Sequence, residues 1–164
     1  MKLDKVTRLF VLSTVGLLLF WVDAWLQLLG GLGLSLTVTI FALWYLGVRD
    51  SLWITVIWIF FGSLFFGEFS EILFTGAGGL LAFATVACLR PILKETQIWI
   101  LGCLGASAFQ LGKLLVAVFL AKEISYMLYF PFFMFFGVLL GSFLGLCTQF
   151  LINKGNNLWK TIFK

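Results

Sequence analysis

Six long apolar runs, separated by short segments that hold glycine, proline or charge, occupy most of this 164-residue chain. Within each run almost every side chain is apolar, so a helix would be hydrophobic on all sides and water could not solvate it. At ~1.5 Å per residue, about 20 residues cross the ~30 Å hydrocarbon core of a bilayer. The sequence therefore predicts an all-α polytopic membrane protein with six transmembrane helices, over residues 9–29, 32–46, 51–66, 72–89, 97–121 and 128–152.

The composition excludes a soluble domain, because 62% of the residues are hydrophobic and only 11% are charged. We expect residues 1–152 to form the membrane domain, with no cleaved leader, since the first run is too long for a signal peptide. The second and third runs are short for a full crossing. Either they extend into the flanking loops, or the bilayer thins around them.

Basic residues predict the orientation of the chain. In a six-span arrangement only Lys122 falls on one side of the membrane, and Lys113 lies within a span. Short basic loops remain cytoplasmic, so we expect both termini inside, in the cytoplasmic membrane of a bacterium. These basic residues are scattered over the ends of loops rather than clustered, so they indicate topology signals rather than a nucleic-acid-binding surface. The nine basic residues on the cytoplasmic side are Lys2, Lys5, Arg8, Arg49, Arg90, Lys94, Lys154, Lys160 and Lys164.

The C-terminal segment 153–164 has a pattern of its own. Leu158, Trp159, Ile162 and Phe163 recur at one-and-four spacing beside basic residues. This pattern predicts a short amphipathic helix on the anionic cytoplasmic leaflet, although docking onto a cytoplasmic partner would use the same face.

Catalytic residues are scarce. The chain has no histidine, its three cysteines are isolated, and its seven acidic residues form no DxxxD-type pair. Histidine is the commonest metal ligand and proton shuttle. We therefore expect no enzyme activity, no metal site and no cofactor.

Small residues mark a helix-packing surface. Gly137, Gly141 and Gly145 form a tandem GxxxG in the sixth span, and the fifth offers Gly102 and Ala106. Such stripes let two helices approach closely in lipid. Packing within this chain and a sliding surface against a partner subunit both remain open.

Polar residues in the outer third of the membrane are the candidate substrate-binding residues. Lys113 lies ~24 Å along its span, Asp23 lies at ~21 Å in the first span, and Gln110 is one turn from Lys113. A lysine within a span costs roughly 3 kcal/mol unless it snorkels, pairs or lines a wet cavity. Snorkelling, a pair with Asp23 and a ligand pocket remain alternatives. The external loops add Glu68, Glu71 and Tyr126 to the same side.

Several stretches resemble a family of small bacterial membrane proteins: YLGVRDS at 45–51, FGSLFFGEFS at 61–70, the segment 76–91 ending in CLRP, QLGKLLVA at 110–117 and FGVLLGSFLG at 136–145. The family is the Gx transporter group, also called heptaprenyl diphosphate synthase component I. It is related to the substrate-binding S-components of energy-coupling factor (ECF) transporters.

The resemblance implies a six-helix S-component-like bundle with both termini inside and a substrate site near the outer face. It also implies a membrane scaffold and two ATPases as partners, besides lipids and a small organic substrate. The family pattern expects asparagine near Leu36, arginine near Trp58 and histidine-asparagine near Phe109, and this chain departs from it. A more hydrophobic ligand or a loss of transport both fit these departures.

Two functions therefore compete. The first is a substrate-binding membrane subunit that takes up a small molecule such as a vitamin or a hydrophobic precursor. The second is a non-transporting scaffold, like the cell-shape protein MreD or an accessory subunit of a prenyl-lipid pathway.

Overall fold

The computed structural model describes residues 5–25, 33–66 and 69–163, and this part of the chain is helical with no strand. The α-helices are α1 (Lys5–Trp25), α2 (Ser35–Tyr45), α3 (Val48–Phe66), α4 (Phe69–Leu89), α5 (Ile98–Ala121) and α6 (Phe130–Phe163). Two 3-10 turns, η2 (Glu95–Gln97) and η3 (Ile124–Tyr129), precede α5 and α6. The predicted all-α membrane bundle is confirmed. Five of these helices are long and apolar enough to cross a membrane, and α2 is not.

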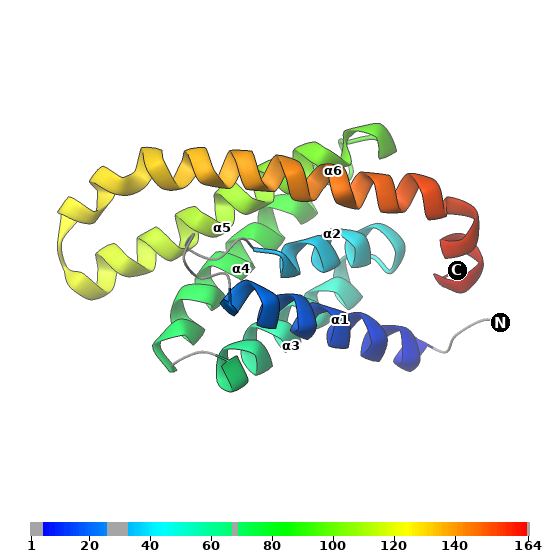
Figure 1. Ribbon diagram of the computed structural model, residues 1–164, viewed down its shortest axis with the longest axis horizontal. Helices are drawn as coiled ribbons and strands as arrows, with labels where there is room; N and C mark the ends of the chain where they lie inside the picture. The colour runs from blue at the N-terminus through cyan, green and yellow to red at the C-terminus, as the bar shows by residue number, and fades with distance from the viewer. Residues whose placement is uncertain (1–4, 26–32, 67–68, 164) are drawn as a thin grey trace.

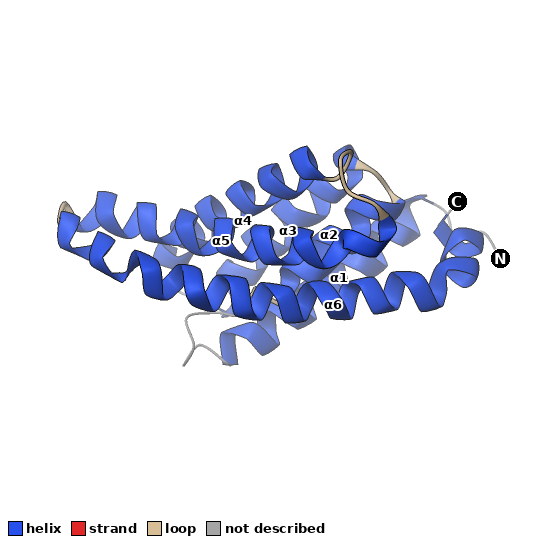
Figure 2. Ribbon diagram, turned by 90° about the horizontal axis from the view of Figure 1, so that it is seen from above, coloured by secondary structure: helices blue, strands red, loops and turns tan. Residues whose placement is uncertain are grey.

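The long helices form an arc around α2. Consecutive members α1, α3, α4, α5 and α6 pack side by side, while α2 contacts all five of them. Figure 1 shows α2 between α6 and α1, and the start of α1 lies at the same end of the bundle as the end of α6. At the opposite end, the α5–α6 hairpin extends beyond the other helices in both views (Figures 1 and 2).

Of the two spans predicted to be short, the third is long enough to cross the membrane and the second is not. α3 begins at Val48, three residues before the predicted start, and its 19 residues suffice for a crossing. α2 has 11 residues, which is ~16 Å or about half of the hydrocarbon core. Gly33 and Gly47 adopt left-handed φ angles of 68° and 92° on either side of it, a conformation that suits glycine. Seven of its side chains are buried, so neighbouring helices rather than lipid surround most of it.

A basic residue stabilises the end of α2 that precedes Gly47. The Arg90 guanidinium, just beyond α4, donates to the Trp44 backbone oxygen at 3.0 Å and lies 5.9 Å from the centre of the Trp44 ring. The last carbonyls of a helix have no partner within it and carry partial negative charge, which a cation offsets. Through Arg90, Trp44 thus connects α2 with the end of α4.

A directed chain of hydrogen bonds joins α2 to α3 in the core. Trp58 Nε1 donates to Thr39 Oγ1 at 3.1 Å. The Thr55 hydroxyl donates its hydrogen bond to the Ser51 backbone oxygen at 2.9 Å. Thr39 must therefore donate to Thr55 Oγ1, 3.1 Å away. Both threonines and Trp58 are at most 1% exposed. Each hydroxyl is thus satisfied where no water reaches it.

Thr39→Val is expected to destabilise the protein by about 1–3 kcal/mol, because valine keeps the shape but leaves the Trp58 indole N–H buried without an acceptor. Thermal unfolding in detergent measures the loss. Thr85→Val is the control, since the Thr85 hydroxyl donates to Leu81 O one turn earlier on its own helix. Equal melting temperatures for the two variants would show that the chain contributes nothing to stability.

Tight packing of α5 on α6 forms the largest helix contact. A Cβ added to Gly102 would lie 2.5 Å from Gly141 O and from Gly145 Cα, and one added to Gly141 would lie 2.6 Å from Ala106 Cβ. At Gly137 the same atom would be 3.0 Å from Ser107 Cα. The predicted packing residues on both helices thus lie against one another within a single chain.

Candidate functional site

The site is built around Asp23, in the last turn of α1. Its side chain is 6% exposed, and its Oδ2 accepts a hydrogen bond from the Gly33 backbone N–H at 2.9 Å. Gly33 precedes α2 by two residues. The carboxylate therefore ties the end of α1 to the start of α2, at the end of the bundle that the basic residues assign to the outside.

Helix α5 supplies the other side of the site. Phe109 and Gln110 are 3% and 4% exposed, and Lys113 follows one turn later, half-buried. The Lys113 ammonium lies 4.7 Å from the centre of the Phe109 ring, within cation–π range. A Cβ added to Gly33 would be 3.8 Å from Phe109 Cδ1. Gly33 and Phe109 thus connect Asp23 with Lys113.

A close crossing of α4 and α5 fixes the position of Lys113. A Cβ added to Gly112 would lie 2.6 Å from Gly78 Cα, and one added to Gly78 would lie 2.7 Å from Phe109 O. Neither helix can carry a side chain at this point, so their backbones touch. Because Gly112 is the neighbour of Lys113, the crossing holds the lysine at a defined depth and direction.

The remaining predicted site residues lie elsewhere or outside the described residues. Glu68 lies outside them, and Glu71 is in the first turn of α4. Tyr126 belongs to η3, which packs on α5 and α6 at the end of their extended hairpin. The structure therefore links Asp23 to Gly33 and Lys113 to Phe109, with Gln110 buried on the same helix as Lys113, and it carries Tyr126 on the hairpin.

Sequence reasoning missed the roles of Gly33 and Phe109. Two signals were available: the glycine-rich break around residues 30–33, and the i, i+4 spacing of Phe109 and Lys113. Together the site offers a carboxylate, an amide, an ammonium group and an aromatic face within an apolar bundle. Such a set suits a small ligand with polar groups. Within the described residues, no group of three or more acidic, cysteine or histidine side chains is placed to bind a metal.

One comparison with known proteins gives a match. A family model described as heptaprenyl diphosphate synthase component I matches residues 12–151, which include the whole site. No curated protein and no solved structure matches the chain.

Proposed function

The chain belongs to the heptaprenyl diphosphate synthase component I family, and from this premise we propose that it is a substrate-binding membrane subunit. In this proposal it resembles the S-components of ECF transporters. It captures a small organic molecule at the outer face of a bacterial cytoplasmic membrane and releases it inward. A separate membrane scaffold and two ATPases supply the energy, because the sequence contains no GxxxxGK[ST] phosphate-binding motif.

The observation that carries this proposal is the position of three polar side chains inside the bundle: Asp23 bonded to Gly33, Lys113 on the Phe109 ring, and Gln110 buried on the same helix. Buried or half-buried polar groups are costly within a membrane and face the bundle interior, where they mark substrate paths. Here they come from α1 and α5, and Gly33, which precedes the enclosed helix α2, bonds to Asp23 and lies near Phe109. An apolar surround with a few convergent polar groups is the usual composition of a small-molecule site.

The family's name supports a second candidate, an accessory subunit of a prenyl-lipid pathway that transports nothing. A component of a synthase need not bind the substrate itself. A membrane scaffold of the MreD kind is a variant of this reading. Under either candidate we propose that the chain performs no chemistry, because it has no histidine and its seven acidic residues are dispersed.

Native mass spectrometry of the protein purified in mild detergent separates the two candidates. A substrate-binding subunit should retain one small organic molecule per chain and co-purify with a membrane scaffold and two ATPases. An accessory subunit should instead co-purify with a soluble prenyl-transferring enzyme and retain no small molecule. The second result would overturn the transport proposal.

A further inference from the structure

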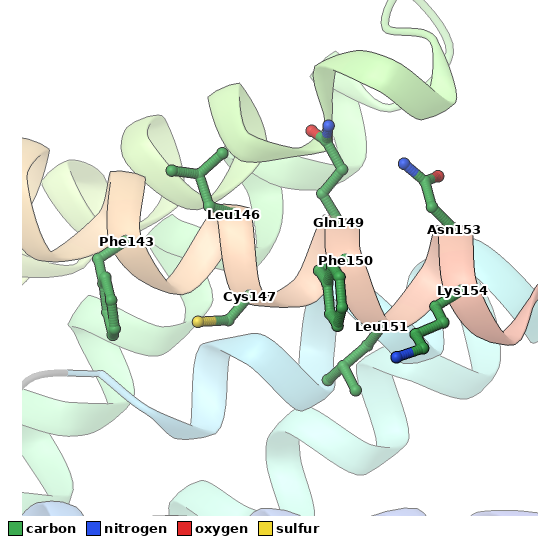
Figure 3. Close-up of a pocket in the computed structure, with 8 residues that line it drawn as sticks. All are labelled: Phe143, Leu146, Cys147, Gln149, Phe150, Leu151, Asn153 and Lys154. Carbon is green, nitrogen blue, oxygen red and sulfur yellow. The ribbon is translucent and has the colours of Figure 1, made fainter.

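One face of α6 is apolar and exposed, and no helix covers it within the part of the chain that the structure describes. In Figure 3 the side chains of Phe143, Cys147, Leu151 and Lys154 point from α6 toward the side on which α2 lies. Gln149 and Asn153 point the other way. The side chains of Phe143, Phe150 and Leu151 are 64%, 62% and 49% exposed. The α6 stripe consists of Phe143, Cys147, Phe150, Leu151 and Lys154.

The stripe borders the opening of the helix arc. α1 and α6 both pack against α2, and neither packs substantially on the other among the described residues. A groove of about 960 Å³ runs along the exposed side of α6, and every described residue that lines it belongs to α6, Gln149 and Asn153 included. In a membrane such a groove is filled by lipid or by a partner.

The length and charge of the stripe match one lipid molecule. From Phe143 to Lys154 the helix rises ~16 Å, about half of a ~30 Å hydrocarbon core and thus one leaflet. At its end the Lys154 ammonium lies 5.2 Å from the centre of the Phe150 ring, above the apolar surface. The first turns of α1, which carry Arg8, lie at this same end of the bundle.

The bulky side chains argue against a partner helix on this stripe. Transmembrane helices meet through small residues, and α6 already uses Gly137, Gly141 and Gly145 against α5. Phenylalanine and leucine instead leave an uneven surface to which a flexible acyl chain conforms. Basic groups at the cytoplasmic ends of membrane helices attract anionic lipid headgroups.

We propose that the α6 stripe binds an anionic phospholipid of the cytoplasmic leaflet, with one acyl chain along Phe143, Cys147 and Phe150 and the phosphate at Lys154. The lipid closes the arc between α1 and α6 and covers α2 from that side. This site is separate from the Asp23–Lys113 site, and it does not rest on the proposed function.

The test uses the full-length protein in nanodiscs with equal amounts of phosphatidylglycerol and phosphatidylcholine, followed by native mass spectrometry of retained lipid. The wild type should retain phosphatidylglycerol preferentially. Lys154→Gln should lower that preference about fivefold, which corresponds to ~1 kcal/mol for one basic residue near the surface. Lys154→Arg should preserve it. Lys94→Gln is the matched control and should change nothing, since Lys94 is exposed, is also predicted on the cytoplasmic side and lies outside the stripe.

Three results would overturn the proposal. The first is equal retention of the two lipids by the wild type. The second is an unchanged phosphatidylglycerol preference in Lys154→Gln. The third is displacement of phosphatidylglycerol by an equal amount of geranylgeranyl diphosphate, which would assign the stripe to a prenyl diphosphate instead. Melting temperatures of all variants are measured alongside, because Lys154 is exposed and its replacement should leave the fold intact.

Discussion

Gly141→Leu is expected to lower the melting temperature in detergent by roughly 10 °C. A Cβ at this position would lie 2.5 Å from the Gly102 backbone oxygen. A backbone atom cannot move away by changing a rotamer, so α5 and α6 must separate along their length. Overpacking of this kind costs about 3 kcal/mol, and in lipid no hydrophobic effect between helices compensates for the lost contacts.

A graded series tests the cause of this loss. Gly141→Ala should also lower the melting temperature, because one methyl group already meets Gly102 O and Ala106 Cβ. The decrease should be smaller than for leucine, since alanine adds fewer atoms. Gly76→Ala is the matched control, since the nearest atom to its new Cβ, Ile59 Cγ2, is 3.9 Å away. Alanine is the better helix former by ~1 kcal/mol, so this control should be neutral or slightly stabilising. A wild-type melting temperature for Gly141→Leu would mean that the glycines of α6 do not contact α5.

The long helices were predictable from the sequence because hydropathy along the chain reports which segments enter the bilayer. Helix ends were less predictable, since hydropathy marks the edge of the membrane rather than the end of the hydrogen-bonded backbone. The first span was predicted to begin at residue 9, whereas α1 begins at Lys5, and the predicted end at 29 lies outside the described residues. The last span was predicted over 128–152 with a separate short helix over 153–164, whereas α6 runs without a break from Phe130 to Phe163. Beyond Ile152, Gly155 and three asparagines weaken the helix, but no proline interrupts it.

The central position of α2 could not be predicted in the same way. Hydropathy cannot distinguish a helix surrounded by lipid from one surrounded by other helices. The hydrogen-bonded set Trp58, Thr39 and Thr55 joins residues 16 and 19 positions apart, and such pairing appears only when the helices are packed. Thr39 was the available signal, because a hydroxyl within a short apolar span needs a partner inside the protein, and Thr39 finds Thr55 and Trp58.

For the candidate site, the sequence predicts how deep each side chain lies in the membrane but not toward which neighbouring helix it points. Counting residues along each span places Asp23 and Lys113 at similar heights, and in the structure Gly33 and Phe109 lie between them. Rotation of each helix about its axis depends on close crossings such as Gly78 on Gly112. A single sequence shows the glycines of such a crossing without showing which of them meet.

Lys113→Met should reduce ligand retention at least tenfold if Lys113 binds a polar or anionic group of the substrate, because a hydrogen bond to a charged group contributes about 1.5–3 kcal/mol. Methionine has a similar length and no charge, so the fold should remain intact or become slightly more stable. Native mass spectrometry of the retained small molecule, with the melting temperature of the same sample, measures both effects. Lys122→Met, at the exposed turn after α5, is the control and should retain ligand normally.

Combining Lys113→Met with Asp23→Asn separates the three roles open to Lys113. Asparagine keeps an oxygen that can accept the Gly33 N–H, so Asp23→Asn removes the charge and preserves the link between α1 and α2. If Lys113 and Asp23 pair, Lys113→Met alone should destabilise the protein, and the second change should restore part of the loss. If Lys113 only snorkels, neither retention nor stability should change. A substrate-binding role requires loss of retention without that compensation, so unchanged ligand retention in Lys113→Met would falsify it.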